Sequence, residues 1–262
     1  MKTKLRAIIL TQGDRFFIPS NIRKAAAICD VIEVVQVNCK ASLDHKLRQY
    51  LCWFGPWQFA KMGALTISRA LLDKLDRLLA YRLMHGSCSV QSAAGACGLC
   101  FRVIQDSNDP DFVVHVRALA PDLIVSYSAP QVLREELLSL PKHGAINVHG
   151  SLLPDFRGCL PSFWHLCCGE ALGGATVHYM SRKIDDGDIL EQASVDISDC
   201  KTMYRLIQRT KRLGGDLMVQ AIQDIANGTV KRRPNHTDEG RYFTWPDKEQ
   251  AKAFRKRGCR LI

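Results

Sequence analysis

The sequence predicts an α/β protein built on a doubly wound, mainly parallel sheet. Short apolar runs rich in Val, Ile and Leu alternate along the chain with amphipathic segments of helical length. Such alternation favours strand–helix–strand units, in which helices cover both faces of a parallel sheet. With 262 residues, 47% of them hydrophobic, the chain can bury a core of this kind. We therefore expect a Rossmann-like architecture.

The chain opens with a predicted strand–helix–strand unit. A buried strand is expected at Leu5–Leu10, a helix that Pro19 opens runs to about Cys29, and a β-branched strand follows at Val31–Val37. A dinucleotide-binding protein of this topology would carry G-x-G-x-x-G directly after the first strand. Only Gly13 stands there, so NAD or FAD binding is not expected.

Residues 40–86 interrupt the alternation with a helical insertion rich in Leu, Trp, Phe, Arg and Lys. Gly55-Pro56 separates two helical segments, and the second has leucines at 71, 72, 75, 78 and 79, which is helical spacing. The favoured interpretation is a helical pair packed on the sheet. A peripheral membrane face or a homodimer contact through this insertion stays open as an alternative.

From Ser89 onward the alternation of strands and helices resumes. Strands are predicted at 101–104, 121–126, 144–148, 174–180 and 189–197, and helices at 89–97, 110–119, 130–138, 162–169 and 202–227. The last two strands are expected to pair across a turn at 185–187. We expect one domain over residues 1–227, insertion included, and a C-terminal extension over 228–262 with an aromatic motif at 242–246 and a basic tail.

Composition narrows the class of protein. Eleven cysteines, an odd number without regular spacing, favour reduced thiols, and the single C-x-x-C at Cys97 and Cys100 lacks the second pair of a zinc site, so no metal is expected. No apolar run reaches the roughly 18–20 residues that span a bilayer, and no signal-peptide pattern follows Met1, so we expect a cytoplasmic protein. The net charge of +10 suits an anionic partner without naming one.

Polar side chains mark the ends of two neighbouring strands. Asn147 and His149 stand where the fifth strand gives way to a loop, and their spacing of two points both side chains to the same side. Three carboxylates surround a glycine turn at 185–188. In parallel sheets ligands bind beyond the carboxyl ends of strands, a rule that also selects residues 126–131 after the fourth strand. An amide, an imidazole and an acid are a set suited to acyl transfer.

The stretch 147–158, Asn-Val-His-Gly-Ser-Leu-Leu-Pro-Asp-Phe-Arg-Gly, resembles the NxHxSLLPxxxG signature of the folate-dependent formyltransferases. Residues 184–190, Ile-Asp-Asp-Gly-Asp-Ile-Leu, are similar to the family's (L/I)DxGDI(L/I) motif. The step of 36 positions from His149 to Asp185 also matches the family spacing. The resemblance covers about 89–227 and is faint before that.

This resemblance implies the formyltransferase fold, a formyltransferase domain over 1–227 and 10-formyltetrahydrofolate as the formyl donor. It makes Asn147, His149 and Asp185 the catalytic residues. The pteridine would lie against two segments, after the fourth strand and in the loop before 187. The implied cofactor-binding residues are Ser126, Tyr127, Ser128, Ala129, Pro130, Gln131, Val132, Ile184 and Asp186.

The chemistry of formyl transfer needs these residue types. An amine attacks the formyl carbon directly, and the tetrahedral intermediate carries negative charge on oxygen and positive charge on nitrogen. Asn147 would donate a hydrogen bond to the oxygen, His149 would shuttle protons near neutral pH, and Asp185 would orient the imidazole. No covalent enzyme intermediate is required. We interpret His178, on a strand between apolar neighbours, as a structural residue.

The acceptor is inferred from the resemblance alone. Chain length and the aromatic motif at 242–246 resemble most closely the nucleotide-sugar N-formyltransferases, so we expect a nucleotide-linked amino sugar. A nucleic-acid partner is not expected, because the 35 residues after Asn227 are too few for a tRNA-binding barrel domain. Methionyl-tRNA, glycinamide ribonucleotide and a non-catalytic folate- or nucleotide-binding role remain alternatives.

Overall fold

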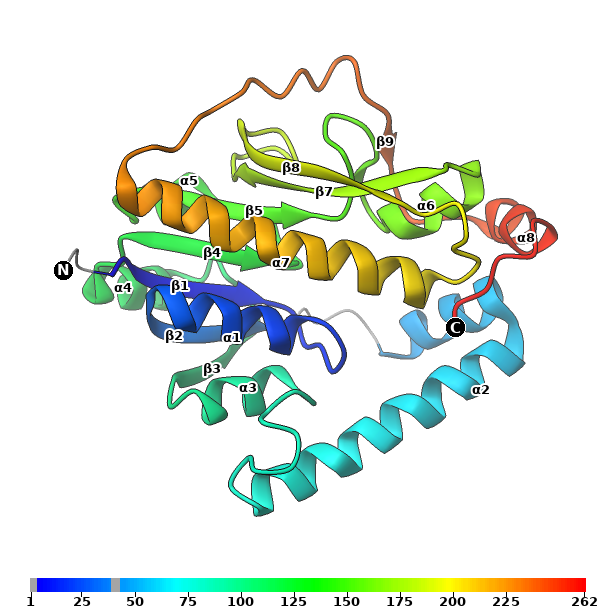
Figure 1. Ribbon diagram of the computed structural model, residues 1–262, viewed down its shortest axis with the longest axis horizontal. Coiled ribbons are helices and arrows are strands. Elements are labelled where there is room, and N and C mark those ends of the chain that lie inside the picture. The colour runs from blue at the N-terminus through cyan, green and yellow to red at the C-terminus, as the bar shows by residue number, and fades with distance from the viewer. Residues whose placement is uncertain (1–3, 39–42) are drawn as a thin grey trace.

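The computed structural model describes residues 4–38 and 43–262, and a seven-stranded sheet forms its centre (Figure 1). The order of its strands is β3-β2-β1-β4-β5-β7-β8. The strand pairs β3–β2, β2–β1, β1–β4 and β4–β5 are parallel, whereas β5–β7 and β7–β8 are antiparallel. This confirms the predicted doubly wound, mainly parallel sheet. The strands are β1 (Arg6–Thr11), β2 (Asp30–Val37), β3 (Cys100–Ile104), β4 (Leu123–Tyr127), β5 (Ala145–His149), β7 (Leu172–Tyr179) and β8 (Ile189–Asp196).

Helices cover both faces of the sheet and form two separate cores. Ala7 and Ile9 of β1 point into one core, while Ile8 and Leu10 point into the other, as the two-residue period of a strand requires. Helices α1 (Ile18–Ile28), α3 (Val90–Ala96) and α7 (Met203–Asn227) contribute to the first core, and α4 (Pro110–Leu119) and α5 (Glu135–Leu138) to the second.

Close packing of α7 on the sheet fixes the position of β5. A Cβ atom on Gly214 would lie 2.5 Å from Val148 Cγ2, so only glycine permits this helix to approach the strand so closely. Val148 stands between the two polar residues predicted for the site, Asn147 and His149. Helix α7 therefore covers the face of β5 that carries Val148, and Asn147 and His149 point to the opposite face.

One predicted helix is wrong over most of its length. Only Glu135–Leu138 of the expected helix 130–138 is helical. The preceding backbone is instead bonded to a neighbouring loop, because Asn108 Oδ1 accepts from the Arg134 amide and Asn108 Nδ2 donates to the Val132 carbonyl. Side-chain amides that satisfy backbone groups in this way stabilise a loop in place of a helix.

The insertion forms α2 (Leu43–Leu78), which is broken at Gly55, where φ is +79°, directly before Pro56. The predicted pair of helices is thus confirmed, but its main partner is α8 (Lys248–Lys256) and not the sheet (Figure 1). Phe54 contacts Phe254 of α8 with ring centroids 5.7 Å apart. Among the described residues, no helix combines the length and the apolar character needed to cross a membrane.

The C-terminal extension folds back over the loop that follows β5. Strand β9 (Tyr242–Phe243) pairs in parallel with the short strand β6 (Arg157–Gly158), and the chain then enters α8 through a capping box at Asp247. Helix α6 (Pro161–Cys168) lies between this pair and α8, and Phe163 of α6 stacks on Phe254. The sequence did not predict β6 or β9, because two-residue strands have no recognisable period. It did not predict α8 either, whose residues were interpreted only as part of a basic tail.

Candidate active site

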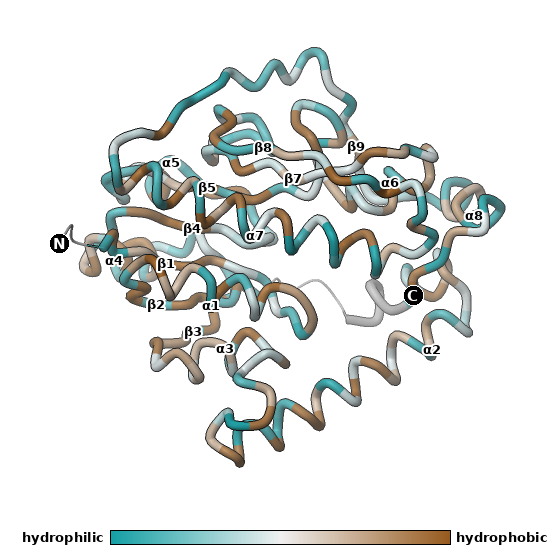
Figure 2. The backbone as a smooth tube through the Cα atoms, viewed as in Figure 1, coloured by the Kyte–Doolittle hydropathy of each residue, from teal (hydrophilic) through white to brown (hydrophobic). Residues whose placement is uncertain are grey.

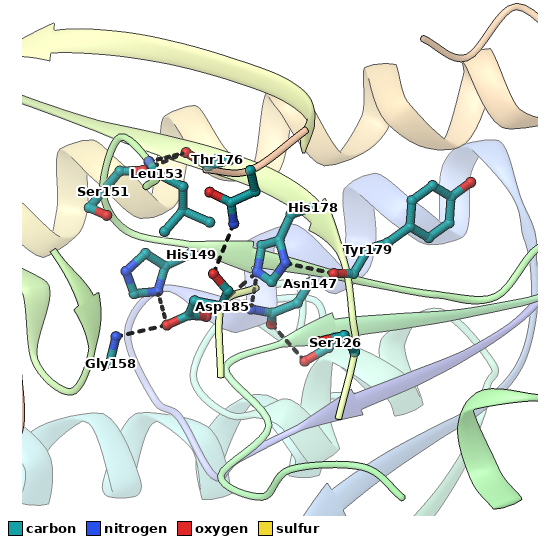
Figure 3. A network of polar contacts seen from close by, with 12 residues as sticks. Ser126, Asn147, His149, Ser151, Leu153, Gly158, Thr176, His178, Tyr179 and Asp185 are labelled. Atoms are coloured by element: carbon teal, nitrogen blue, oxygen red, sulfur yellow. Dashed lines mark hydrogen bonds and ion pairs between the residues drawn. The ribbon is translucent and has the colours of Figure 1, made fainter. Parts of the chain in front are cut away.

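The predicted catalytic residues lie together at the carboxyl end of β5 (Figure 3). The strand runs between β4 and β7, and the register places Asn147 beside Ser126 on one neighbour and beside His178 on the other. Asp185 reaches the same point from the loop between β7 and β8. The structure therefore brings the three residues together, and their catalytic roles stay predictions.

The Asn147 amide is held at both ends. Its Oδ1 accepts from Ser126 Oγ at 2.8 Å, and its Nδ2 lies 3.2 Å from His178 Nε2. His178 Nδ1 faces the Tyr179 carbonyl at 2.8 Å, so this nitrogen carries the proton and Nε2 accepts from Asn147. Within the described part of the chain, the second N–H of the Asn147 amide has no acceptor. It is the donor that the site offers to a ligand.

His149 is buried, with 7% of its surface exposed. Its Nε2 donates to the Phe156 carbonyl at 2.8 Å, and its Nδ1 lies 3.4 Å from Asp185 Oδ2. Burial lowers the pKa of the His149 imidazole, and the Asp185 carboxylate and Phe156 carbonyl offset only part of this effect. The ring is therefore neutral near pH 7, and Nδ1 is the nitrogen that can gain a proton beside a carboxylate.

Asp185 adopts a left-handed backbone with φ at +50°, a conformation that Asp tolerates better than most residues. Its Oδ2 accepts from the Gly158 amide at 2.9 Å, and its Oδ1 lies 3.6 Å from His178 Nε2. Burial by itself raises the pKa of Asp185, but the charge that His149 and His178 carry when protonated, together with the Gly158 amide, holds it well below its usual range. The carboxylate thus stays charged in a nearly closed environment.

The loop after β5, residues 150–158, is tied down on both sides. The Leu153 amide donates to Thr176 Oγ1 at 3.1 Å, and Gln192 Nε2 donates to the Leu153 carbonyl at 2.8 Å. On the other side, Phe156 stacks on Phe243 of the C-terminal extension with centroids 5.2 Å apart. The carbonyl that faces His149 and the amide that faces Asp185 both belong to this loop, so the extension helps to position the site.

The segment predicted to bind the cofactor begins at the site and leads away from it. Ser126 contacts Asn147, and the Ala129 amide lies 3.4 Å from Ser126 Oγ. Ser128, with φ at +59°, accepts a hydrogen bond from Lys211 Nζ. The Tyr127 side chain is fully buried in the core, so only its backbone faces the loop.

The remaining predicted cofactor residues have different surroundings. Gln131 Oε1 accepts from the Ser107 amide at 2.7 Å and so fixes the loop, which also contains Pro130. Val132 and Ile184 expose 42% and 41% of their surfaces. Asp186 accepts from Thr237 Oγ1 at 3.1 Å. Apolar surface is therefore available on both segments, while most of the polar side chains are engaged within the protein.

Two residues of the site were missed from the sequence. His178, interpreted as structural, has its ring between Asn147 and Asp185, and the antiparallel register of β5 and β7 alone would have predicted this position. Lys211 is a half-buried cation on α7. Burial lowers the pKa of Lys211, and the Asp14 carboxylate offsets part of this effect. The charge of Lys211 in turn helps to lower the pKa of His149. Helical spacing gave no signal for it, because its hydrogen-bond partner, Ser128, lies far from it in the sequence.

Comparison with known proteins identifies the central part of the chain. Residues 96–222 match the family model described as Formyl transferase. The methionyl-tRNA formyltransferase of Acetivibrio thermocellus is 36% identical over 139 residues, which is 53% of this chain and 45% of that protein. That of Thermodesulfovibrio yellowstonii is 30% identical over 173 residues, 66% of this chain and 56% of that protein. The chain thus spans about half the length of the curated relatives it matches.

Solved structures share the fold over most of the chain. The glycinamide ribonucleotide transformylase 1 of Symbiobacterium toebii has a TM-score of 0.60 at 18% identity and covers 86% of this chain and 89% of its own. A sugar N-formyltransferase from Shewanella sp FDAARGOS_354 has a TM-score of 0.57 at 19% identity, with coverages of 92% and 76%. At these identities the likeness concerns the fold alone.

Proposed function

Because the chain belongs to the folate-dependent formyltransferase family, we propose that it transfers a formyl group from 10-formyltetrahydrofolate to the amine of a nucleotide-linked amino sugar. The observation that carries formyl transfer is the single network of Asn147, His149 and Asp185 at the end of β5. Residues 1–227 would form the catalytic domain, and 228–262 an extension that steadies the loop after β5.

Each catalytic residue has one role in the proposed reaction. The donor supplies an activated formyl carbon, which the acceptor amine attacks to form the new C–N bond. The free N–H of Asn147 donates to the formyl oxygen as it gains negative charge. His149 Nδ1 takes the proton that the amine loses, and Asp185 stabilises the resulting imidazolium. The C–N bond to the folate breaks, and that folate nitrogen receives the proton in return.

A folate has suitable partners beside the loop 184–186. Asn235 donates from Nδ2 to the Asp185 carbonyl at 2.9 Å, and its Oδ1 is buried without a partner among the described residues. A pteridine carries N–H groups that such an orphaned acceptor would bind, since a buried unpaired oxygen is costly. The exposed side chains of Val132 and Ile184 supply apolar surface for the flat ring. We assign the donor site to 126–132 and 184–186 on this basis.

Lys211 supports a phosphorylated small acceptor. It is half-buried near the catalytic imidazole and contacts only one hydroxyl, Ser128 Oγ, among the described residues. The Asp14 carboxylate acts on Lys211 without forming an ion pair among the described residues, so a diphosphate would provide a directly paired anion. A specific observation also favours a second candidate, because the two curated relatives described above, at 36% and 30% identity, are methionyl-tRNA formyltransferases.

An acceptor panel tests the proposal. The protein is incubated with 10-formyltetrahydrofolate and, in separate reactions, nucleotide-linked 4-amino-6-deoxy sugars, glycinamide ribonucleotide and methionyl-tRNA, and products are identified by mass. We expect a formamide from at least one sugar nucleotide. Formylation of methionyl-tRNA alone would show that the acceptor is methionyl-tRNA and not a sugar nucleotide. If no amine yielded a formamide, the non-catalytic binding role would be favoured.

Substitution of Lys211 separates acceptor binding from chemistry. Lys211→Gln removes the cation and is expected to raise KM for the sugar nucleotide about tenfold, with kcat within a few-fold of the unchanged protein. Since the cation also lowers the pKa of His149, and the neutral imidazole is the active form, the acid limb of the kcat profile should move to higher pH. The matched control is Arg212→Gln, the exposed next residue of α7; an unchanged KM in Lys211→Gln contradicts the assignment.

A further inference from the structure

The second half of α2 and the residue that follows it, together residues 57–79, turn an apolar face away from the protein. Figure 1 shows this segment along the outer edge of the molecule, with no other element beyond it, and Figure 2 shows hydrophobic residues recurring along it. Steps of three or four residues place Ile67, Leu71, Leu75 and Leu78 on one face of the helix, and at about 100° per residue Trp57, ten positions before Ile67, falls on the same face. The exposed fractions are 70% for Trp57, 62% for Ile67, 62% for Leu71, 45% for Leu75 and 83% for Leu78.

The inner face of the same helix is charged, which reverses the usual polarity of a surface helix. Asp73 and Asp76, the two acids of residues 57–79, are 2% and 0% exposed. Asp73 pairs with Arg77 at 3.0 Å and accepts from Ser89 Oγ at 2.8 Å. Asp76 accepts from the backbone amides of the turn that follows the helix. No carboxylate of this segment therefore reaches its outer face.

Cations border the apolar face. With about 100° between successive helical residues, Lys61 and Lys74 lie on opposite edges of the arc that holds Leu71 and Leu75. Both lysines are exposed, and Arg82 is exposed just beyond the helix. The outer surface of 57–79 thus combines a continuous apolar row, a tryptophan and positive charge on both sides.

We propose that this face lies in the surface layer of a bilayer rich in anionic lipids. Apolar side chains would enter the boundary between headgroups and acyl chains, and the two flanking lysines would extend to the lipid phosphates. Because no described helix is able to cross a membrane, the segment lies on the bilayer and does not span it. The inference does not depend on the proposed formyl transfer, since it involves none of the residues at the end of β5.

Charge complementarity favours anionic lipids over a second copy of the chain on this face. The outer face of 57–79 carries two exposed lysines, whereas both of its acids, Asp73 and Asp76, are buried. A second copy that presents the same face would therefore offer no carboxylate to Lys61 or Lys74, whereas anionic lipids attract both lysines.

Vesicle sedimentation of the full chain tests the proposal. Vesicles of phosphatidylcholine alone are compared with vesicles that contain phosphatidylglycerol as well, at low and at high salt. We expect binding to the anionic vesicles that weakens with salt. Leu71→Gln, which changes an exposed side chain, should lower the partition coefficient about tenfold, and Lys61→Gln with Lys74→Gln should weaken binding to anionic vesicles only.

A matched control keeps the test specific to this face. Val114 on α4 is 61% exposed, close to the 62% of Leu71, so Val114→Gln removes a similar exposed apolar group elsewhere. Binding that Val114→Gln leaves intact and Leu71→Gln weakens supports the proposal. Absence of binding to anionic vesicles, or binding that Leu71→Gln does not alter, overturns it. A dimer in light scattering that Leu71→Gln dissociates, without vesicle binding, assigns the face to a second copy and overturns it as well.

Discussion

His149→Ala is expected to lower kcat by about a thousandfold or more, because general base catalysis and the imidazolium–carboxylate pair are lost together. The ring is the group at the site whose Nδ1 can accept a proton near neutral pH, with Asp185 3.4 Å away. Affinity for tetrahydrofolate should change by only a few-fold, because the proposed donor site lies on 126–132 and 184–186. Single-turnover formylation and a folate titration measure the two quantities.

His143→Ala is the matched control for this substitution. His143 precedes β5 at its opposite end, is half-buried and is joined to Asp122 through its backbone amide, so its ring is remote from the chemistry. We expect the control to keep its rate. If His149→Ala also kept a rate within about fivefold of the unchanged protein, proton transfer could not pass through this imidazole, and the proposed mechanism would be abandoned.

Most of the sheet was predictable because its strands are short apolar runs separated by helices of regular period. The positions of Asn147 and His149 followed from the same pattern, since a strand end and a spacing of two place them together. His178 could not be placed in this way, because its role depends on which strand pairs with β5. Strand β7 pairs with β5 in the antiparallel direction and so brings His178 opposite Asn147. The alternation of strands and helices along the sequence does not show which strands pair.

The insertion shows a second limit of sequence periodicity. The leucines of 71–79 correctly predicted a helix and an apolar face, and the natural expectation is that such a face turns inward. In the structure the inward side of the helix carries Asp73 and Asp76. These carboxylates accept hydrogen bonds from the Ser89 hydroxyl and from backbone amides of a turn. Periodicity identifies the two faces of a helix, but which of them meets the protein depends on partners far along the chain.

Asn147→Asp is expected to lower kcat about a hundredfold or more, because it removes one preorganised donor to the developing oxyanion. The substitution keeps the shape of the side chain and an oxygen for the Ser126 hydroxyl, which bonds Asn147 Oδ1 at 2.8 Å. It replaces the donating Nδ2 by an acceptor and adds a second carboxylate to a site that already contains Asp185. Rapid-quench formylation at several pH values measures the effect.

Ser126→Ala separates the position of the amide from its chemistry. It deletes the hydroxyl that holds Oδ1 but leaves both N–H groups of Asn147, so we expect a loss of about tenfold in kcat, smaller than that of Asn147→Asp. His178 still accepts from Nδ2 at 3.2 Å in this variant and limits the rotation of the amide. Equal losses in the two variants would mean that the hydroxyl itself contacts the reacting group, and an unchanged rate in Asn147→Asp would remove the amide from the mechanism. The order of the two effects therefore tests whether the network at the end of β5 exists to aim a single N–H.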